Sequence, residues 1–121
     1  MPHLSLQTNV PKSKVSQDFL KETTKVIANT LSKPDSYCVV SVEADLPMAW
    51  GGSTDPCGVA TLMSIGQLGT EANKKHSAAI SSHLEKHLGI PKNRLYINFI
   101  DAKPADVGHD GTTFHAIFGG K

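Results

Sequence analysis

The residue best suited to chemistry in this chain is Pro2, because it follows Met1 directly. A small second residue normally allows the initiator methionine to be removed, and proline then becomes a free secondary amine. An ordinary α-amino group has a pKa of about 7.7 to 8, and burial or a neighbouring cation lowers it. With Met1 removed, Pro2 could therefore serve as a base near neutral pH. The alternative is that Pro2 only stiffens the start of a strand.

Three histidines offer a second chemical possibility, since His76, His83 and His87 lie near one stripe of an expected helix. His83 and His87 are four residues apart, a spacing with which two imidazoles can bind one metal ion. No carboxylate or cysteine completes such a site, so we do not expect a bound metal. Cys38 and Cys57 lack CxxC spacing and are expected to be reduced and packed, although their pairing stays open.

Composition limits the class of protein. The 121 residues suit one domain, residues 1–121, and 39% hydrophobic content is enough for a core. Twelve basic and 11 acidic residues give a net charge of +1, which favours neither nucleic acid nor an anionic membrane as partner. The sequence has no signal peptide pattern and no long apolar run, so we expect a soluble chain without membrane insertion.

Hydrophobic periodicity predicts the elements that must position these residues. Alternating residues and β-branched runs predict four strands, at 2–8, 37–42, 57–68 and 95–100. Helical spacing predicts one helix that begins at Ser13 or Ser16 and ends before Pro34, and another from Thr70 to Gly89. The tail from Val107 to Phe118 is expected to form a short strand or an arm.

The predicted order is a β-α-β unit repeated once. Each helix can join parallel strands, and right-handed crossovers would place both helices on one face of a four-stranded sheet. Because only two helices are available, the opposite face would need cover from other subunits. Oligomerisation is therefore an expectation of the architecture.

Several motifs together resemble the macrophage migration inhibitory factor family of the tautomerase superfamily. They cover nearly the whole chain: Met1-Pro2, TNVP at 8–11, KP at 33–34, MAWGGSTDPC at 48–57, SIGQLG at 64–69, RLYINFID at 94–101, and the VG and TF of VGHDGTTF. The resemblance implies an α/β (α+β) tautomerase fold with a mixed sheet and short extra strands, assembled as a homotrimer. It also implies keto-enol tautomerisation of phenylpyruvate-like or dopachrome-like substrates.

The same resemblance implies a role for each site residue. Pro2 would be the catalytic base, taking a proton α to a carbonyl and returning it to the other end of the enol system without a cofactor. Lys33 would attract the substrate carboxylate and lower the pKa of Pro2. The remaining positions would line the pocket: Ser64, the backbone amide of Ile65, Tyr96 and Asn98 from a neighbouring subunit, the apolar walls Val107 and Phe114, and Tyr37 from an adjoining chain.

The chain departs from the family pattern at several positions. His109 stands where the vertebrate protein has a tryptophan, and Met63 replaces a histidine often found beside the pocket. CGVA at 57–60 lacks the second cysteine of a CxxC pair, so thiol-disulfide oxidoreductase activity is not expected. Residues 115–121 extend beyond the vertebrate terminus.

The resemblance leaves two further functions open. One is a cytokine-like protein that is cytoplasmic and exported without a signal peptide, in which tautomerase activity is vestigial and a cell-surface receptor is the partner. Lys12 and Asp45 match a basic and an acidic position implicated in receptor contact, and otherwise would be solvated charges. The other is a D-dopachrome tautomerase-like enzyme, although Tyr96 and Asn98 favour the first branch.

Overall fold

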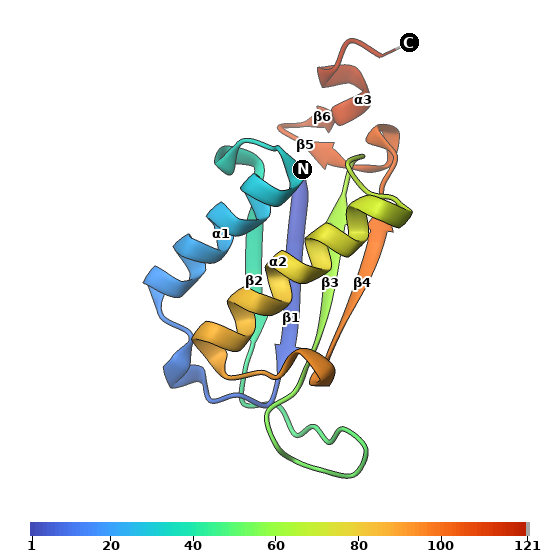
Figure 1. The fold of residues 1–121 in the computed structure, drawn as a ribbon. Coiled ribbons are helices and arrows are strands. Elements are labelled where there is room, and N and C mark those ends of the chain that lie inside the picture. The colour runs from blue at the N-terminus through green and yellow to red at the C-terminus, as the bar shows by residue number, and fades with distance from the viewer. Residues whose placement is uncertain (121) are drawn as a thin grey trace.

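Four strands form one mixed sheet in the order β2-β1-β3-β4, as a computed structural model of residues 1–120 shows. The strands are β1 (Pro2–Thr8), β2 (Val39–Glu43), β3 (Gly58–Ser64) and β4 (Leu95–Asp101). β1 pairs with β2 and β3 with β4 in parallel, whereas β1 and β3 are antiparallel. The helices α1 (Gln17–Leu31) and α2 (Thr70–Leu88) cover the same face of this sheet (Figure 1). The predicted fold class and both β-α-β units are confirmed.

Side-chain alternation along β1 explains why the helices cover one face only. Leu4 and Leu6 are buried beneath the helices, whereas the intervening His3 and Ser5 lie on the uncovered face. Pro2 stands opposite Ser64 of β3 in the antiparallel register. The first strand therefore occupies an interior position in the sheet, with its amino end at the same edge as the carboxyl end of β3.

The two helices begin and end at residues that suit helix termini. Ser16 caps α1, since its Oγ accepts a hydrogen bond of 3.0 Å from the Phe19 amide. Gly89 ends α2 with a φ of 72°, a backbone conformation that glycine adopts without strain. The cap expected at Thr70 is wrong by one residue. Gly69 holds that position, and its amide donates to Asn73 Oδ1 at 3.2 Å.

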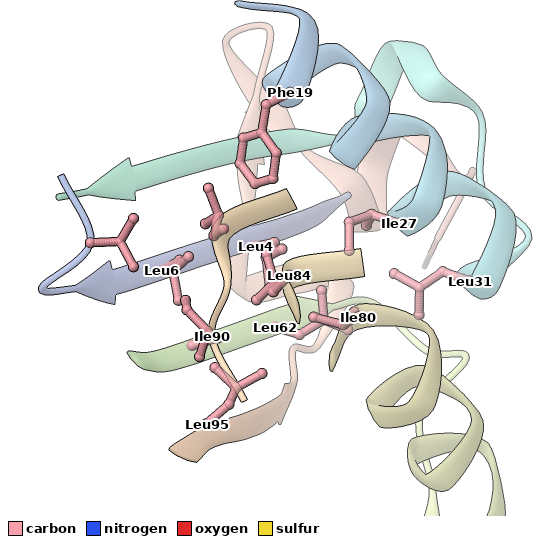
Figure 2. Close-up of a cluster of buried hydrophobic side chains, with 13 residues drawn as sticks. Leu4, Leu6, Phe19, Ile27, Leu31, Leu62, Ile80, Leu84, Ile90 and Leu95 are labelled. Atoms are coloured by element: carbon pink, nitrogen blue, oxygen red, sulfur yellow. The ribbon is translucent and has the colours of Figure 1, made fainter. Parts of the chain in front are cut away.

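The core lies between the helices and the sheet, where leucine and isoleucine side chains from both layers interdigitate (Figure 2). Ile27 and Leu31 of α1 and Ile80 and Leu84 of α2 all point into it. Each fully buried aliphatic side chain of this kind contributes about 1.5–3 kcal/mol. This layer fixes the amino end of β1 against the last turn of α1.

Two predicted strands were too long. The strand expected to continue to Leu68 ends at Ser64, because Gly66 and Gln67 have positive φ angles of 76° and 62° and turn the chain away from the sheet. The strand expected from Tyr37 begins at Val39, since residues Asp35–Tyr37 form a short 3-10 turn.

The carboxyl-terminal part forms a small unit near the amino terminus. Strands β5 (Gly108–His109) and β6 (Thr112–Thr113) make a hairpin, and the one-turn helix α3 (Phe114–Ile117) follows. Figure 1 places this unit close to the amino end of β1. The expected extension at 115–121 is thus structured through residue 120, and Lys121 lies outside the described residues.

The opposite face of the sheet carries exposed apolar side chains. Tyr96 is 65% exposed, Val39 52% and Ile100 48%. These residues alternate with the buried positions of β2 and β4, so they share the face without helices. Among the described residues, no helix has both the length and the apolar character that crossing a bilayer requires.

Candidate functional site

The site begins at the amino terminus. Burial, followed by repulsion from the Lys33 ammonium, lowers the pKa of the Met1 α-amino group below its ordinary value, while Cys38 has a smaller opposing effect. The next residue, Pro2, is buried at the start of β1. An amine at this end of the sheet is therefore in an environment that favours its neutral form.

Lys33 reaches the site from the end of α1. Its backbone amide donates to Ala28 O at 2.9 Å, which anchors the residue to the last helical turn. Its ammonium Nζ donates to the carbonyl oxygen of Ile65 at 2.8 Å. The side chain thus brings a positive charge to the loop that follows β3, close enough to affect the terminal amine.

Ser64 has a buried hydroxyl without a hydrogen-bond partner, the one such side-chain atom found among residues 1–120. Because it stands opposite Pro2, the unpartnered oxygen lies at the same end of the sheet as the amine. The adjoining loop is fixed by two contacts, in which the Gly66 amide donates to Asp101 Oδ1 and the Ala102 amide to Ser64 O. A buried polar atom of this kind is available to a ligand or a water molecule.

An aromatic cluster lies beside this end of the sheet. The rings of Tyr37, His109 and Phe114 are mutually packed, with centroids 5.2–6.0 Å apart. The Phe114 amide donates to Val107 O at 3.1 Å, which joins the two expected apolar positions. Tyr37 packs on Phe114 within one chain, and its expected contribution to the site of an adjoining chain stays a prediction.

Tyr96 and Asn98 lie elsewhere in the single chain. Tyr96 pairs with Val59 and Asn98 with Thr61, whereas Pro2 pairs with Ser64. The five-residue step from Val59 to Ser64 corresponds to about 16 Å along β3. Tyr96 instead packs on Trp50 at a centroid distance of 4.3 Å. One chain therefore brings Pro2, Lys33, Ser64 and Ile65 to the same end of the sheet, but it does not bring Tyr96 close to the amine.

The sequence did not single out Cys38 as a site neighbour. Its thiol is close enough to interact electrostatically with both the terminal amine and Lys33, and burial and Asp35 together raise its pKa. No sequence signal marked this residue, because its position depends on the turn at 35–37 that brings it beside β1. Both cysteines are free, as expected from their spacing.

The histidines have structural partners. His76 is 2% exposed, with Nδ1 2.8 Å from Thr30 Oγ1 and Nε2 2.7 Å from Gln67 O. His83 Nε2 lies 2.8 Å from Thr23 Oγ1. Within residues 1–120 no three histidine, cysteine, aspartate or glutamate side chains gather in a metal-binding arrangement.

The two residues considered for receptor contact are joined through the backbone of Lys12. Asp45 Oδ2 accepts a hydrogen bond of 2.9 Å from the Lys12 amide, and the Asp45 amide donates to Val10 O. Asp45 has a φ of 59°. Its carboxylate therefore fixes the turn at Lys12–Lys14, which is a structural role.

Comparisons with known proteins support one family. The sequence model described as Macrophage migration inhibitory factor (MIF) matches residues 1–115. A macrophage migration inhibitory factor homolog of Trichuris trichiura is 46% identical over 114 residues, covering 94% of this chain and all of that protein. The solved structure of the factor from Trichinella spiralis is 46% identical with a TM-score of 0.89, covering 93% of this chain and 99% of the other. A homologue from Prochlorococcus marinus has 32% identity, a TM-score of 0.88, and coverage of 93% and 98%.

Proposed function

This chain belongs to the macrophage migration inhibitory factor family, and from that premise we propose that it is a cofactor-independent keto-enol tautomerase. Its substrates would be small aromatic 2-keto acids such as phenylpyruvate, or dopachrome-like compounds. The observation that carries the proposal is the environment of the amino terminus: burial and Lys33 lower the pKa of the Met1 α-amino group, and Pro2, the next residue, is buried at the same end of the sheet. A base is most effective when its pKa lies near the working pH.

The proposed mechanism starts with removal of Met1, which makes the Pro2 nitrogen a secondary amine. Its lone pair takes a proton from the carbon α to the substrate carbonyl, and the electrons of the broken C–H bond form the enolate. The same nitrogen then returns the proton to the oxygen, which gives the neutral enol. Lys33 would attract the substrate carboxylate, and the buried Ser64 hydroxyl and the Ile65 amide would line its binding position.

We further propose a homotrimer, in which a neighbouring subunit supplies Tyr96 and Asn98. Two observations support this assembly: the uncovered sheet face is rich in exposed apolar residues, and within one chain Tyr96 lies far from Pro2. Asn98 would then donate a hydrogen bond to the developing enolate oxygen. Val107 and Tyr37 would form the apolar side of the pocket, backed by the buried ring of Phe114, on which Tyr37 packs.

The test is turnover of phenylpyruvate and of dopachrome methyl ester by wild-type protein and by Pro2→Gly, with the mature terminus of each defined by mass spectrometry. Glycine also permits removal of methionine but supplies a different amine on a flexible residue. We expect turnover to fall by about 100-fold or more, as for loss of a general base. Equal turnover by two fully processed proteins would contradict the role of Pro2.

A cytokine-like role is a second proposal, supported by the migration inhibitory factor names of the relatives. The protein would act in the cytoplasm and, after export without a signal peptide, at a cell-surface receptor. Binding of Pro2→Gly to the family's receptor ectodomain tests this role separately from turnover. Binding without turnover would favour signalling, whereas absence of binding by both proteins would contradict it.

A further inference from the structure

The chain continues beyond the family match into an ordered turn. The family match ends at residue 115, and the Trichuris relative is fully covered by 114 aligned residues. Beyond that point Thr113 Oγ1 accepts from the Ala116 amide, and the Phe118 amide donates to Phe114 O at 2.9 Å. The Gly120 amide closes the turn by donating to His115 O at 2.7 Å. The added residues thus have defined hydrogen bonds rather than a free tail.

This turn places a further ring on the aromatic cluster. Phe118 packs on Phe114 at a centroid distance of 5.5 Å, while His109 stacks on Phe114 at 5.2 Å with an interplanar angle of 3°. Phe114 is consequently only 2% exposed. A ligand approaching the chain cannot reach the ring of Phe114 in this arrangement, although the family resemblance gives that ring the role of an apolar wall.

The aromatic surface that remains accessible belongs to other residues. Phe118 is 60% exposed and Tyr37 40% exposed, and both rings contact Phe114. Tyr37 directly precedes Cys38, which interacts electrostatically with the terminal amine. Phe118 is thus linked to the amine end of the sheet through Phe114 and Tyr37, and Figure 1 shows α3, the helix directly before Phe118, beyond that end of the sheet.

We propose that Phe118 is a specificity-determining residue, which gives this chain an additional aromatic wall at the mouth of the amine site and selects carboxylic acids that carry an aromatic ring. The inference rests on the proposed function for the location of the site. Offset or edge contacts between aromatic rings strengthen binding beyond the area they bury. An aliphatic acid would have no comparable gain from Phe118.

The test uses two non-reacting probes, 3-phenylpropanoate and pentanoate, whose binding to the processed protein is measured by ligand-observed NMR. Neither probe has a ketone, so binding is independent of turnover. We expect Phe118→Ala to weaken 3-phenylpropanoate binding about tenfold and to change pentanoate binding by less than about twofold. Phe118→Leu, which keeps an apolar side chain without a ring, should give an intermediate loss.

Ile117→Ala is the matched control, because Ile117 is exposed on the same turn and lies outside the aromatic contacts. Circular dichroism of each variant checks that the fold is retained. Equal losses for both probes, equal losses in Phe118→Ala and Ile117→Ala, or no binding of 3-phenylpropanoate by the wild type would overturn the inference. If Phe118→Ala weakens only the binding of 3-phenylpropanoate, but the wild-type protein has no turnover, the result would support the inference and contradict the proposed function.

Discussion

Lys33 is the residue with two separable electrostatic effects at the site. Its ammonium lowers the pKa of the terminal amine, and it stands beside the loop that would hold a substrate carboxylate. The sequence alone would place such a lysine among ordinary charges at a helix end. Its contact with Ile65 O instead directs it into the site.

Replacing Lys33 should therefore change the pH profile as well as affinity. In Lys33→Gln the amine loses a repelling charge, so its pKa rises and the acidic limb of kcat/KM moves to higher pH. KM for phenylpyruvate should also rise, since the carboxylate loses its cation. The measurement is kcat/KM from about pH 5 to about pH 8.5, an interval that runs from about three units below the ordinary amine value to just above it.

Lys25→Gln, on an exposed position of α1, provides the control for a general change in net charge. An unchanged acidic limb in Lys33→Gln would show that the amine does not respond to this lysine.

At the scale of elements, the start of α1 depends on one hydroxyl. Ser16→Ala removes the acceptor of the Phe19 amide, and the free energy of unfolding should fall by about 1 kcal/mol. Ser13, which was an equally good candidate from sequence, lies in the preceding 3-10 turn without a capping contact. Urea denaturation of Ser16→Ala and Ser13→Ala should therefore separate the two positions, and equal losses would contradict the cap.

The contact between α1 and α2 should make stability depend on pH through His83. Burial and then the neighbouring His87 lower its pKa, and Lys86 adds to this effect while Glu22 opposes it. Because the folded protein holds the proton less tightly than the unfolded chain, stability falls as pH decreases below the ordinary histidine value of about 6.5. The loss levels off below the lowered pKa of the folded state.

His83→Gln should reduce this dependence, because glutamine can still donate to Thr23 but does not titrate. The measurement is the urea midpoint at pH 7.5 and at pH 5.5, which lie about one unit on either side of the ordinary value. His115→Gln on α3, away from this contact, should retain the wild-type difference. The role of His83 is contradicted if the urea midpoint of His83→Gln falls between the two pH values by as much as that of the wild type.

Element prediction succeeded where local pattern and packing agree. Strand 2–8 has strict alternation and is observed with the same bounds, and Gly89 ends α2 as expected. The apolar run at 57–68 predicted too long a strand, because hydrophobicity did not reveal the left-handed backbone at Gly66 and Gln67. The burial of His76 could not be predicted from local pattern, because its two partners, Thr30 and Gln67, come from other segments.

At the scale of the whole molecule, Tyr96 lies too far from Pro2 within one chain for the two residues to share a site. Sequence spacing showed that both residues match one family pattern, but only the strand register shows that they lie toward opposite ends of β3. The site residues that one chain unites come from β1, the end of α1 and the loop after β3. A second copy is the proposed source of the remaining two.

Mixing two inactive variants tests this shared site. Pro2→Gly and Asn98→Ala should each have low turnover alone, because each lacks one half. After joint unfolding and refolding, a mixed cyclic trimer contains some interfaces with an intact Pro2 on one subunit and an intact Asn98 on the next. Random mixing at equal amounts should restore about a quarter of the wild-type sites. Recovery no greater than the average of the two variants would contradict a site shared between subunits.

The position of Pro2 at the amino end of an interior strand has a consequence for how activity would be controlled. The proposed reactive atom belongs to the main chain, and it becomes an amine only when an aminopeptidase has cleaved the preceding peptide bond. Folding of the sheet and creation of the base are then separate events. The processed fraction of a preparation, rather than its folded fraction, would set its specific activity, and any tag fused ahead of Pro2 would silence the protein while leaving its sheet intact.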